Sequence, residues 1–365
     1  MTKHSTSSGA PLHKQIEATV RQWIAEGRYG AGDQLPPARE MSESCGIKEQ
    51  TVRRALKRLI DEGVLKGAQG KGVFVSATGT KHKRVALVLP NLEDELTRQI
   101  ARGTQDTLDA AGLQTFILDA GRDSAKEDVH IVDLPTLPID GAIIFPISYG
   151  DISEHILRLK DAALPFVLID KYFPGIACDC VLADDYGGTY ALTTELAQRG
   201  YRRFGWLSGE AGSTTVENRL EGFRWALGDQ GIPISRQQVR RLKLETPTED
   251  FRPKVAVEID ALLALPAEAR PEIIVCSNDL IALETMWALR QRGLDVPGDI
   301  GVTGFDDSKA ALESGLTSVQ KSITQMGSKA AELLLNRLTR KSAPPERVVL
   351  PTAPVFRHST ERQTT

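Results

Sequence analysis

From residue 84 onward, apolar and polar positions alternate in blocks that predict a regular succession of strands and helices. Short continuous apolar runs, such as residues 85–89, are typical of parallel strands buried on both faces. The expected strands span residues 85–89, 114–118, 141–145, 165–169, 180–183, 203–207, 239–242, 272–276 and 300–304. The expected helices span residues 94–111, 123–134, 153–162, 186–199, 216–230, 250–264, 279–292 and 322–340. This alternation predicts a doubly wound α/β fold, and about 270 residues exceed one usual domain, so we expect two lobes.

Residues 11–75 show helical apolar spacing instead. A first helix begins near Leu12, and a second begins after Pro36 and Pro37, because proline is tolerated in the first helical turn. A third helix at residues 48–62 has apolar side chains on one face. Its other face carries Gln50, Thr51, Arg53, Arg54, Lys57 and Arg58. This order predicts a helix-turn-helix motif, whose second helix enters the DNA major groove.

Two short apolar segments follow the third helix, at residues 64–65 and 73–75. The turn between them is rich in Gly and holds Lys71, so we expect a β-hairpin whose basic tip can reach phosphate or the minor groove. Together these elements predict a winged helix-turn-helix domain of α+β class. A small three-helix bundle with a merely solvated basic face is the alternative, but the order of all the elements favours DNA binding.

The charge of the chain is divided between its two parts. The net charge is -3, yet residues 1–84 hold 15 Lys and Arg against 8 Asp and Glu. A basic head on an acidic body fits a DNA-binding module joined to a part that does not bind DNA. Residues 76–83 are small and polar with a basic end, which is typical of a linker.

The sequence shows no sign of a metal site, a cofactor or a membrane segment. Cys178 and Cys180 are too close together for a usual zinc pair, and no Cys or His pair lies nearby. We expect the four cysteines to be reduced thiols of a cytoplasmic protein. The polar N-terminus lacks the apolar core of a signal peptide, and no run of about 18 apolar residues predicts a transmembrane helix.

The head resembles the GntR family of bacterial regulators, on the segment PLHKQI at residues 11–16, the segment GDQLP at residues 32–36, and the helices that follow. This resemblance and the basic face of the third helix predict a DNA-binding set: Arg39, Lys48, Gln50, Thr51, Arg53, Arg54 and Lys71. The chain departs from the family at residues 48–49, where the family commonly has a small residue and then Arg. Glu49 would repel phosphate but could accept a hydrogen bond from cytosine N4, so the family's operator sequence does not carry over.

Residues 84–356 resemble the LacI/GalR effector domain, a periplasmic-binding-protein-like fold. The motifs are ADD at 183–185, GYRR at 200–203, NRLEGF at 218–223, SND at 277–279, VP at 296–297 and GFDD at 304–307. The resemblance implies three crossings between the lobes, near Asp184, near residues 307–316 and near residues 339–345.

A GntR-type head on a LacI-type body is known among sugar-responsive repressors of the arabinose type. It implies a homodimeric repressor that binds a palindromic operator and is released by a small sugar. A purine or other small polar effector, or a corepressor mode, is the alternative.

In open α/β sheets, ligands bind at the carboxyl ends of the strands. The polar residues after the predicted strands are therefore the candidate effector contacts: Arg219, Asn278 and Asp306 in the second lobe, and Asn91, Asp94, Tyr149, Asp170 and Lys171 in the first. Tyr149, Tyr172 and Phe173 are candidate stacking faces. Arg219 donates in a fixed fork and Asp306 accepts several hydrogen bonds, which suits sugar hydroxyls. Purely structural interpretations stay open, because Arg219 could pair with Glu217 or Glu221, Asn278 could cap a helix, and Asp306 could lie in a turn.

Two other function classes have little support. An aminotransferase-like body would need a longer chain and a Schiff-base lysine. The sequence shows no Ser-His-Asp, P-loop or HExxH pattern, so we expect no catalytic residues. A periplasmic solute receptor would not carry a DNA-binding head.

Overall fold

The computed structural model describes residues 11–68, 71–76, 83–147, 152–209, 212–243, 250–340 and 343–361. The chain divides into two compact units, Met1–Lys83 and Arg84–Thr365. Within the described ranges, no helix is long and apolar enough to cross a lipid bilayer, and no group of three His, Cys, Asp or Glu residues is placed to hold a metal ion.

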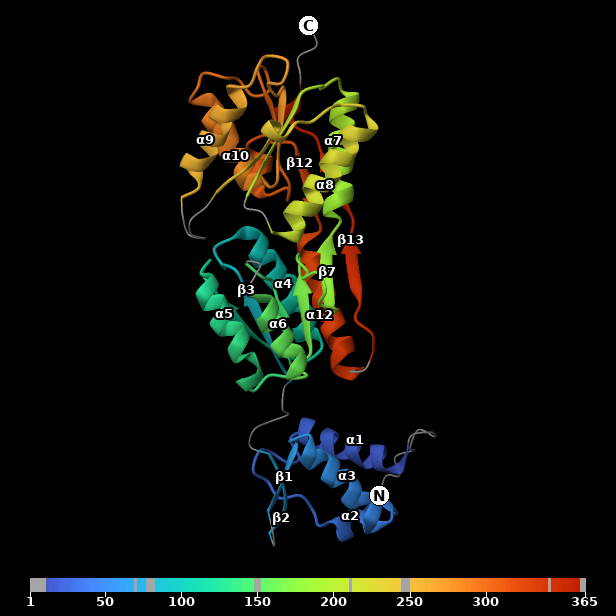
Figure 1. The fold of residues 1–365 in the computed structure, drawn as a ribbon. Coiled ribbons are helices and arrows are strands. Elements are labelled where there is room, and N and C mark those ends of the chain that lie inside the picture. Colours follow the sequence, from blue (N-terminus) through green and yellow to red (C-terminus); the bar gives the residue numbers. More distant parts are fainter. Residues whose placement is uncertain are drawn as a thin grey trace. The chain divides into compact units, whose positions relative to one another are not determined.

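The first unit, here called the head, contains three helices and a two-stranded wing (Figure 1). The elements are α1 (Leu12–Ala25), α2 (Ala38–Cys45), α3 (Glu49–Asp61), β1 (Leu65–Ala68) and β2 (Gly72–Val75). Gly46 ends α2 with a φ of 66°, a left-handed conformation that glycine adopts without a steric penalty. The strands of the wing pair antiparallel, and β1 extends further toward the turn than the predicted segment 64–65. The head therefore has the predicted winged helix-turn-helix architecture.

The first lobe of the second unit is a six-stranded parallel sheet, in the order β13-β7-β6-β5-β3-β4. Its strands are β3 (Arg84–Leu89), β4 (Gln114–Asp119), β5 (Gly141–Ile144), β6 (Phe166–Ile169), β7 (Asp179–Ala183) and β13 (Arg347–Leu350), and its helices are α4 (Glu95–Ala110), α5 (Ser124–Asp133), α6 (Ile152–Asp161) and α12 (Ile323–Thr339). Alternate residues of β3 face opposite sides: Val85 and Leu87 pack with α4 and α12, whereas Ala86 and Val88 pack with α5 and α6. Both faces are therefore buried, as the continuous apolar runs predict.

The second lobe is built in the same way around a parallel sheet of order β11-β10-β8-β9. Its elements are α7 (Asp185–Gln198), β8 (Phe204–Ser208), α8 (Thr214–Asp229), β9 (Val239–Arg241), α9 (Arg252–Leu263), β10 (Ile273–Cys276), α10 (Asp279–Arg290), β11 (Gly301–Thr303) and α11 (Lys309–Glu313). Two apolar clusters cover the sheet, one with α7 and α8 and the other with α9 and α10. Figure 1 shows these helix pairs on opposite sides of the sheet.

The chain crosses between the lobes three times, but only the first crossing lies where the sequence predicts it. β7 belongs to the first sheet and α7 to the second lobe, so Asp184 marks a crossing. The predicted crossing at residues 307–316 is wrong, because α11 still packs in the second lobe. The crossing follows β12 (Ser318–Lys321).

The third predicted crossing, at residues 339–345, is also wrong. β13 still pairs with β7 of the first lobe, and the chain returns only at β14 (Thr352–Val355). The physical reason is the antiparallel pairing of β12 with β14, which form the two adjacent connections.

Candidate functional site

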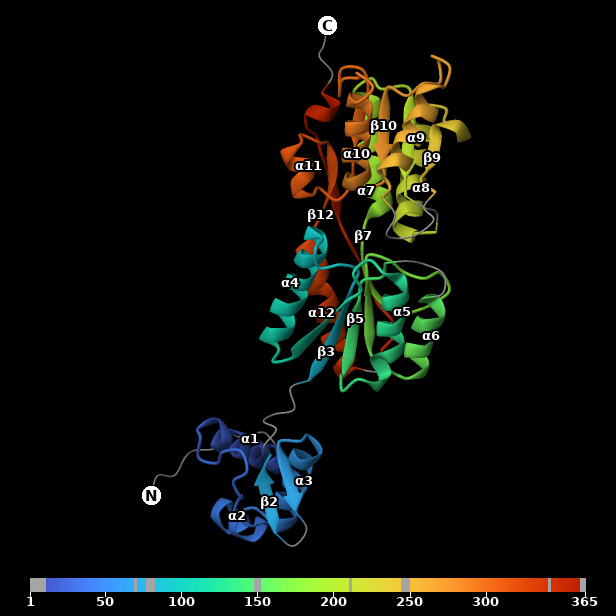
Figure 2. The ribbon, with the colours of Figure 1, turned by 90° about the vertical axis from the view of Figure 1, so that its left-hand side faces the viewer.

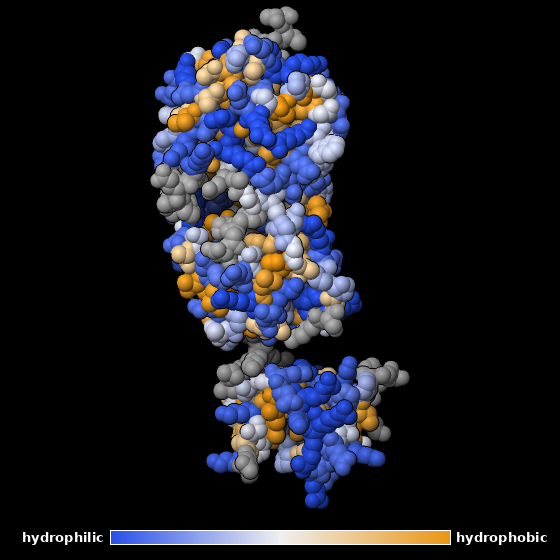
Figure 3. Space-filling view, in the orientation of Figure 1, coloured by the Kyte–Doolittle hydropathy of each residue, from blue (hydrophilic) through white to orange (hydrophobic). Residues whose placement is uncertain are grey.

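The exposed face of α3 presents the predicted DNA-binding side chains. Gln50, Arg53 and Arg54 are exposed, whereas Val52 and Leu59 on the opposite face are buried in the core of the head. Lys48 is exposed at the position that caps the N-terminus of α3, and Thr51 is half-buried in its first turn. Figure 3 shows a band of hydrophilic side chains across the head in that view. One face of α3 therefore holds the fold and the other is free for a ligand.

Two of the three predicted DNA-binding arginines, Arg39 and Arg53, pair with a glutamate one helical turn away. Arg53 Nη2 lies 2.7 Å from Glu49 Oε1, and Arg39 Nε lies 3.2 Å from Glu43 Oε1. Exposed pairs of this kind contribute only about 0.3–0.5 kcal/mol, so phosphate can replace either carboxylate.

The wing tip is fixed by a residue that the sequence did not single out. The side-chain amide of Gln34 donates to the backbone oxygen of Lys71 at 2.8 Å. Gly72 follows with a φ of 108°, where a side chain would be strained and would approach the Gln34 amide to 2.6 Å. These contacts orient the backbone and leave the Lys71 side chain exposed.

In the second unit, polar residues from both lobes form an ion-pair network at the carboxyl ends of the strands. In order along the network, its members are Asp185, Arg219, Asp306, Lys321, Asp170 and Lys171. The nitrogen–oxygen distances between successive members are 2.7, 3.5, 2.9, 3.1 and 3.7 Å. Acids and bases alternate, so every member has a neighbour of opposite charge. The network unites the predicted Arg219, Asp306, Asp170 and Lys171. It adds Asp185, which the sequence analysis gave only as part of a family motif, and Lys321, which it did not single out.

Arg219 is the most fully engaged member. It is 5% exposed, donates to the Ser277 backbone oxygen at 2.6 Å, and lies 3.7 Å from the centre of the Phe305 ring. Pairing with Glu217 is excluded, because Glu217 binds Arg241 instead. The Arg219 fork is thus held rigidly by Asp185 and by the ring beneath it.

Two acids of the network have strained backbones. The φ of Asp170 is 69° and the φ of Asp306 is 108°, and residues other than glycine rarely adopt such angles. A strained backbone persists only where the surrounding structure holds it in place, and such residues cluster at functional sites. Here it aims both carboxylates at the ammonium of Lys321.

Burial and ion pairing set the protonation of the network. Burial alone would raise the pKa of Asp170, but the nearby charges of Lys321, Lys171 and Arg219 outweigh it and lower that pKa. Burial alone would lower the pKa of Lys321, but Asp170 and Asp306 outweigh it and raise that pKa. Burial raises the pKa of Asp185 to about 6 despite the guanidinium of Arg219 beside it. Most members are therefore charged near neutral pH.

Comparison with known proteins bears on both units. Residues 12–75 match the model of bacterial regulatory proteins of the gntR family, and residues 193–360 match that of the periplasmic binding protein-like domain. The "Arabinose metabolism transcriptional repressor" of Geobacillus stearothermophilus is 30% identical over 343 residues, covering 91% of this chain and 92% of the relative.

The chain belongs to the GntR family of bacterial transcriptional regulators. It joins a DNA-binding domain to an effector-binding domain, which is not the architecture of an enzyme.

Solved structures agree on the fold. A transcription regulator GntR from Chromobacterium violaceum, 27% identical, superposes with a TM-score of 0.62 over 76% of this chain and 99% of that chain. A structure titled "transcriptional regulator CelR-cellobiose complex", 23% identical, superposes with a TM-score of 0.67 over 96% of this chain and 100% of that chain.

Three other predicted effector residues of this GntR regulator make local hydrogen bonds to the backbone, and two of them cap helices. Asn278 accepts a hydrogen bond from the Ile281 backbone at 2.9 Å and so caps α10. Asp94 caps α4 in the same way, and Asn91 accepts from the Glu93 backbone at 3.0 Å. Each of these local hydrogen bonds occupies one side-chain oxygen, and the roles of the three residues as effector contacts stay predictions.

The aromatic residues predicted as stacking faces lie in different surroundings. Phe173 packs in an apolar core cluster of the first lobe, and its role as a stacking face stays a prediction. The Tyr172 ring is covered on one face by Arg347, whose guanidinium lies 3.7 Å from its centre. Tyr149 lies outside the described residues. Phe145 follows β5 and has the Lys171 ammonium 5.1 Å from its ring centre, so this aromatic ring lies beside the first-lobe end of the network.

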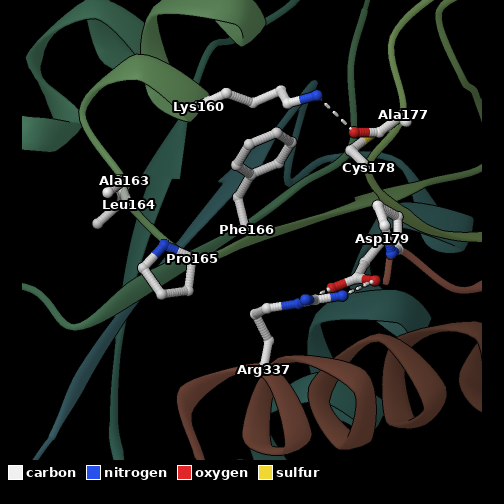
Figure 4. Close-up of a pocket in the computed structure, with 10 residues that line it drawn as sticks. Lys160, Ala163, Leu164, Pro165, Phe166, Ala177, Cys178, Asp179 and Arg337 are labelled. Atoms are coloured by element: carbon white, nitrogen blue, oxygen red, sulfur yellow. Dashed lines mark hydrogen bonds and ion pairs between the residues drawn. The ribbon is translucent and has the colours of Figure 1, made fainter. Parts of the chain in front are cut away.

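A cavity of about 350 Å³ in the first lobe lies away from the network (Figure 4). It is lined at the amino-terminal ends of β6 and β7 by Phe166 and Cys178, whereas the network lies at the opposite ends of the strands. Arg337 from α12 binds Asp179 through two 2.7 Å hydrogen bonds, and Lys160 donates to the Ala177 backbone at 2.8 Å. Ligands of open α/β sheets bind at the carboxyl ends of the strands, so the ion-pair network is the better candidate for the effector site.

Proposed function

We propose that this regulator is a repressor that binds a palindromic operator as a homodimer and leaves it when a small sugar binds between the lobes. The observation that carries this proposal is the ion-pair network. It brings charged donors and acceptors from both lobes together at the strand ends where ligands of α/β sheets bind.

The chemistry of the network suits hydroxyl groups. Carboxylates accept hydrogen bonds, the guanidinium and ammonium groups donate them, and each charged hydrogen bond is worth about 1.5–3 kcal/mol. Three to five such bonds support micromolar binding, which corresponds to about -8 kcal/mol. The names of two similar proteins, which refer to arabinose metabolism and to a cellobiose complex, support a sugar.

DNA binding is assigned to the exposed face of α3, to Arg39 and to Lys71. A single head makes few contacts, and two heads related by two-fold symmetry double them on a palindromic site. We therefore propose that the second unit dimerises.

The surface that we assign to the dimer is an apolar stripe on the second lobe. Leu280 and Trp287 on α10 are 49% and 52% exposed, and Leu312 on α11 is 60% exposed. Leu283 lies between them at helical spacing and is half-buried. Figure 2 shows α10 and α11 side by side, and we propose that these exposed apolar residues of the two neighbouring helices belong to one stripe. A large exposed apolar stripe is typical of an interface, and a second copy offers a matching surface.

A thermal-shift screen followed by an operator-release titration tests the proposed function. At about 100 times its dissociation constant, a sugar effector should stabilise the regulator by roughly 2.7 kcal/mol. The same sugar should then release the regulator from operator DNA. A sugar that stabilises the protein and tightens operator binding would show a corepressor mode instead, and stabilisation by nucleobases alone would contradict the sugar proposal.

A further inference from the structure

Lys321 is the central link of the ion-pair network. Its ammonium lies 3.1 Å from Asp170 of the first lobe and 2.9 Å from Asp306 of the second, and its side chain is 6% exposed. Lys321 ends β12, a strand that connects the lobes. Without the charge of Lys321, the second-lobe members of the network would be two acids, Asp185 and Asp306, and one base, Arg219. The first-lobe members would be one acid, Asp170, and one base, Lys171.

The network as a whole carries no excess positive charge. It contains three acids, Asp170, Asp185 and Asp306, and three bases, Lys171, Arg219 and Lys321. The other acids close to the network add negative charge. Asp279 faces Asp306 and accepts from Ser318 and Ser308, and Glu127 on α5 lies near Lys171. Asp307 is balanced by Arg357 at 2.6 Å.

We infer that Lys321 sets the charge of the ligand that the site accepts, so that the site takes uncharged polyhydroxy ligands and excludes anionic ones. This inference rests on the proposed function, because it concerns the effector of the same site. A neutral sugar can place its hydroxyls between the paired groups and leave the charges balanced. A uronate would bring a negative charge to a site whose cations are all already matched by carboxylates, and a buried charge without a partner is strongly disfavoured.

The inference predicts a change of ligand class when the charge of Lys321 is removed. Lys321→Gln keeps a polar side chain of similar length but leaves the site with one more negative charge. An aminosugar should then bind better than its neutral counterpart, because its ammonium replaces the missing one. Lys321→Arg keeps the charge and should keep the preference of the wild type.

A matched set of three ligands that differ mainly in charge tests the inference: D-galactose, D-galacturonate and D-galactosamine. Thermal shift and calorimetric titration are measured on wild type, Lys321→Gln, Lys321→Arg and Lys329→Gln. Lys329 is an exposed lysine on α12 that pairs with Glu332, so it controls for loss of a lysine elsewhere.

The expected result is that wild type, Lys321→Arg and Lys329→Gln bind D-galactose at least tenfold more tightly than D-galacturonate. Lys321→Gln should gain at least tenfold for D-galactosamine relative to D-galactose. Tighter binding of D-galacturonate than of D-galactose by wild type, or an unchanged preference in Lys321→Gln, would overturn the inference.

The sugar proposal and the charge inference can fail separately. If no member of the set affects the wild type, D-galactosamine with Lys321→Gln decides the inference. Stabilisation of Lys321→Gln by D-galactosamine, absent from Lys321→Arg and from Lys329→Gln, supports the role of Lys321. No stabilisation of any variant overturns it.

Discussion

At the scale of single residues, the site depends on buried charges that the sequence shows only in part. Arg219, Asp306 and Asp170 follow strands or open helices that the apolar pattern predicts, so their meeting at one edge could be anticipated. The place of Lys321 in this site could not be anticipated, because the apolar pattern gives no sign of β12. The Asp185–Arg219 pair also changes how the site should be tested. Arg219→Ala would leave Asp185 buried without its partner, and such a loss typically costs about 3–5 kcal/mol.

Asp279→Asn should make the stability of the protein less dependent on pH. Burial raises the pKa of Asp279 to about 6 from 3.8, a difference of roughly 3 kcal/mol between the two protonation states. A raised pKa means that the folded protein binds the proton more readily than the unfolded chain. Its stabilising contribution is therefore complete below about pH 4 and is lost as the pH rises through about 6.

The measurement is the melting temperature between pH 5 and pH 7.5. The wild type should lose stability over this range, and Asp279→Asn should lose less, by a few degrees. Asp185 acts in the same direction and remains in the variant, whereas the lowered pKa of Asp170 places its own effect at more acidic pH. Asp106→Asn, on the exposed side of α4, is the control. An equal pH slope in wild type and Asp279→Asn would contradict the account.

At the scale of elements, α3 and the wing form the proposed DNA-binding surface. Arg53→Ala and Lys71→Ala should each weaken operator binding and leave the melting temperature nearly unchanged, because both side chains are exposed. If Lys71 contacts phosphate only, its loss should also lower the slope of log affinity against log salt by about one. Lys14→Ala on α1 is the matched control. Wild-type operator affinity in both variants would show that this surface does not bind the operator.

The elements also show where the sequence pattern fails. β3, β5, β6 and β10 are buried on both faces, so their apolar runs predict them directly. β12 ends in Gln320 and Lys321, and β14 contains Pro354, which a strand tolerates only at an edge. These short, mixed segments are held by pairing with each other, a contact between residues more than thirty positions apart that no local pattern contains.

At the scale of the whole molecule, dimerisation and response to the effector are the claims to test. Trp287→Glu and Leu312→Glu place charges in the apolar stripe of the second lobe and should give monomers at micromolar concentration by sedimentation. Because a monomer presents one head, operator affinity should fall by at least tenfold. Val257→Glu, at an exposed apolar position on α9, is the control and should remain dimeric. Dimers in both stripe variants would place the interface elsewhere.

The second unit is suited to act as a switch because three connections join its lobes and the ion-pair network spans them. A ligand shifts such an equilibrium only by its difference in affinity for the two states. A shift from 1:99 to 99:1 takes about 5.5 kcal/mol. The charged hydrogen bonds of Asp306 and Lys321 lie where they can supply much of that difference.

The most direct test is an operator-release titration of Asp306→Asn with the sugar that most stabilises the wild type. We predict that Asp306→Asn binds operator with wild-type affinity in the absence of sugar and is released only at a sugar concentration at least tenfold higher than wild type requires. Asp260→Asn, an exposed acid on α9 that pairs with Arg292, should behave as wild type. Release of Asp306→Asn at the wild-type sugar concentration would show that the effector does not bind at the ion-pair network.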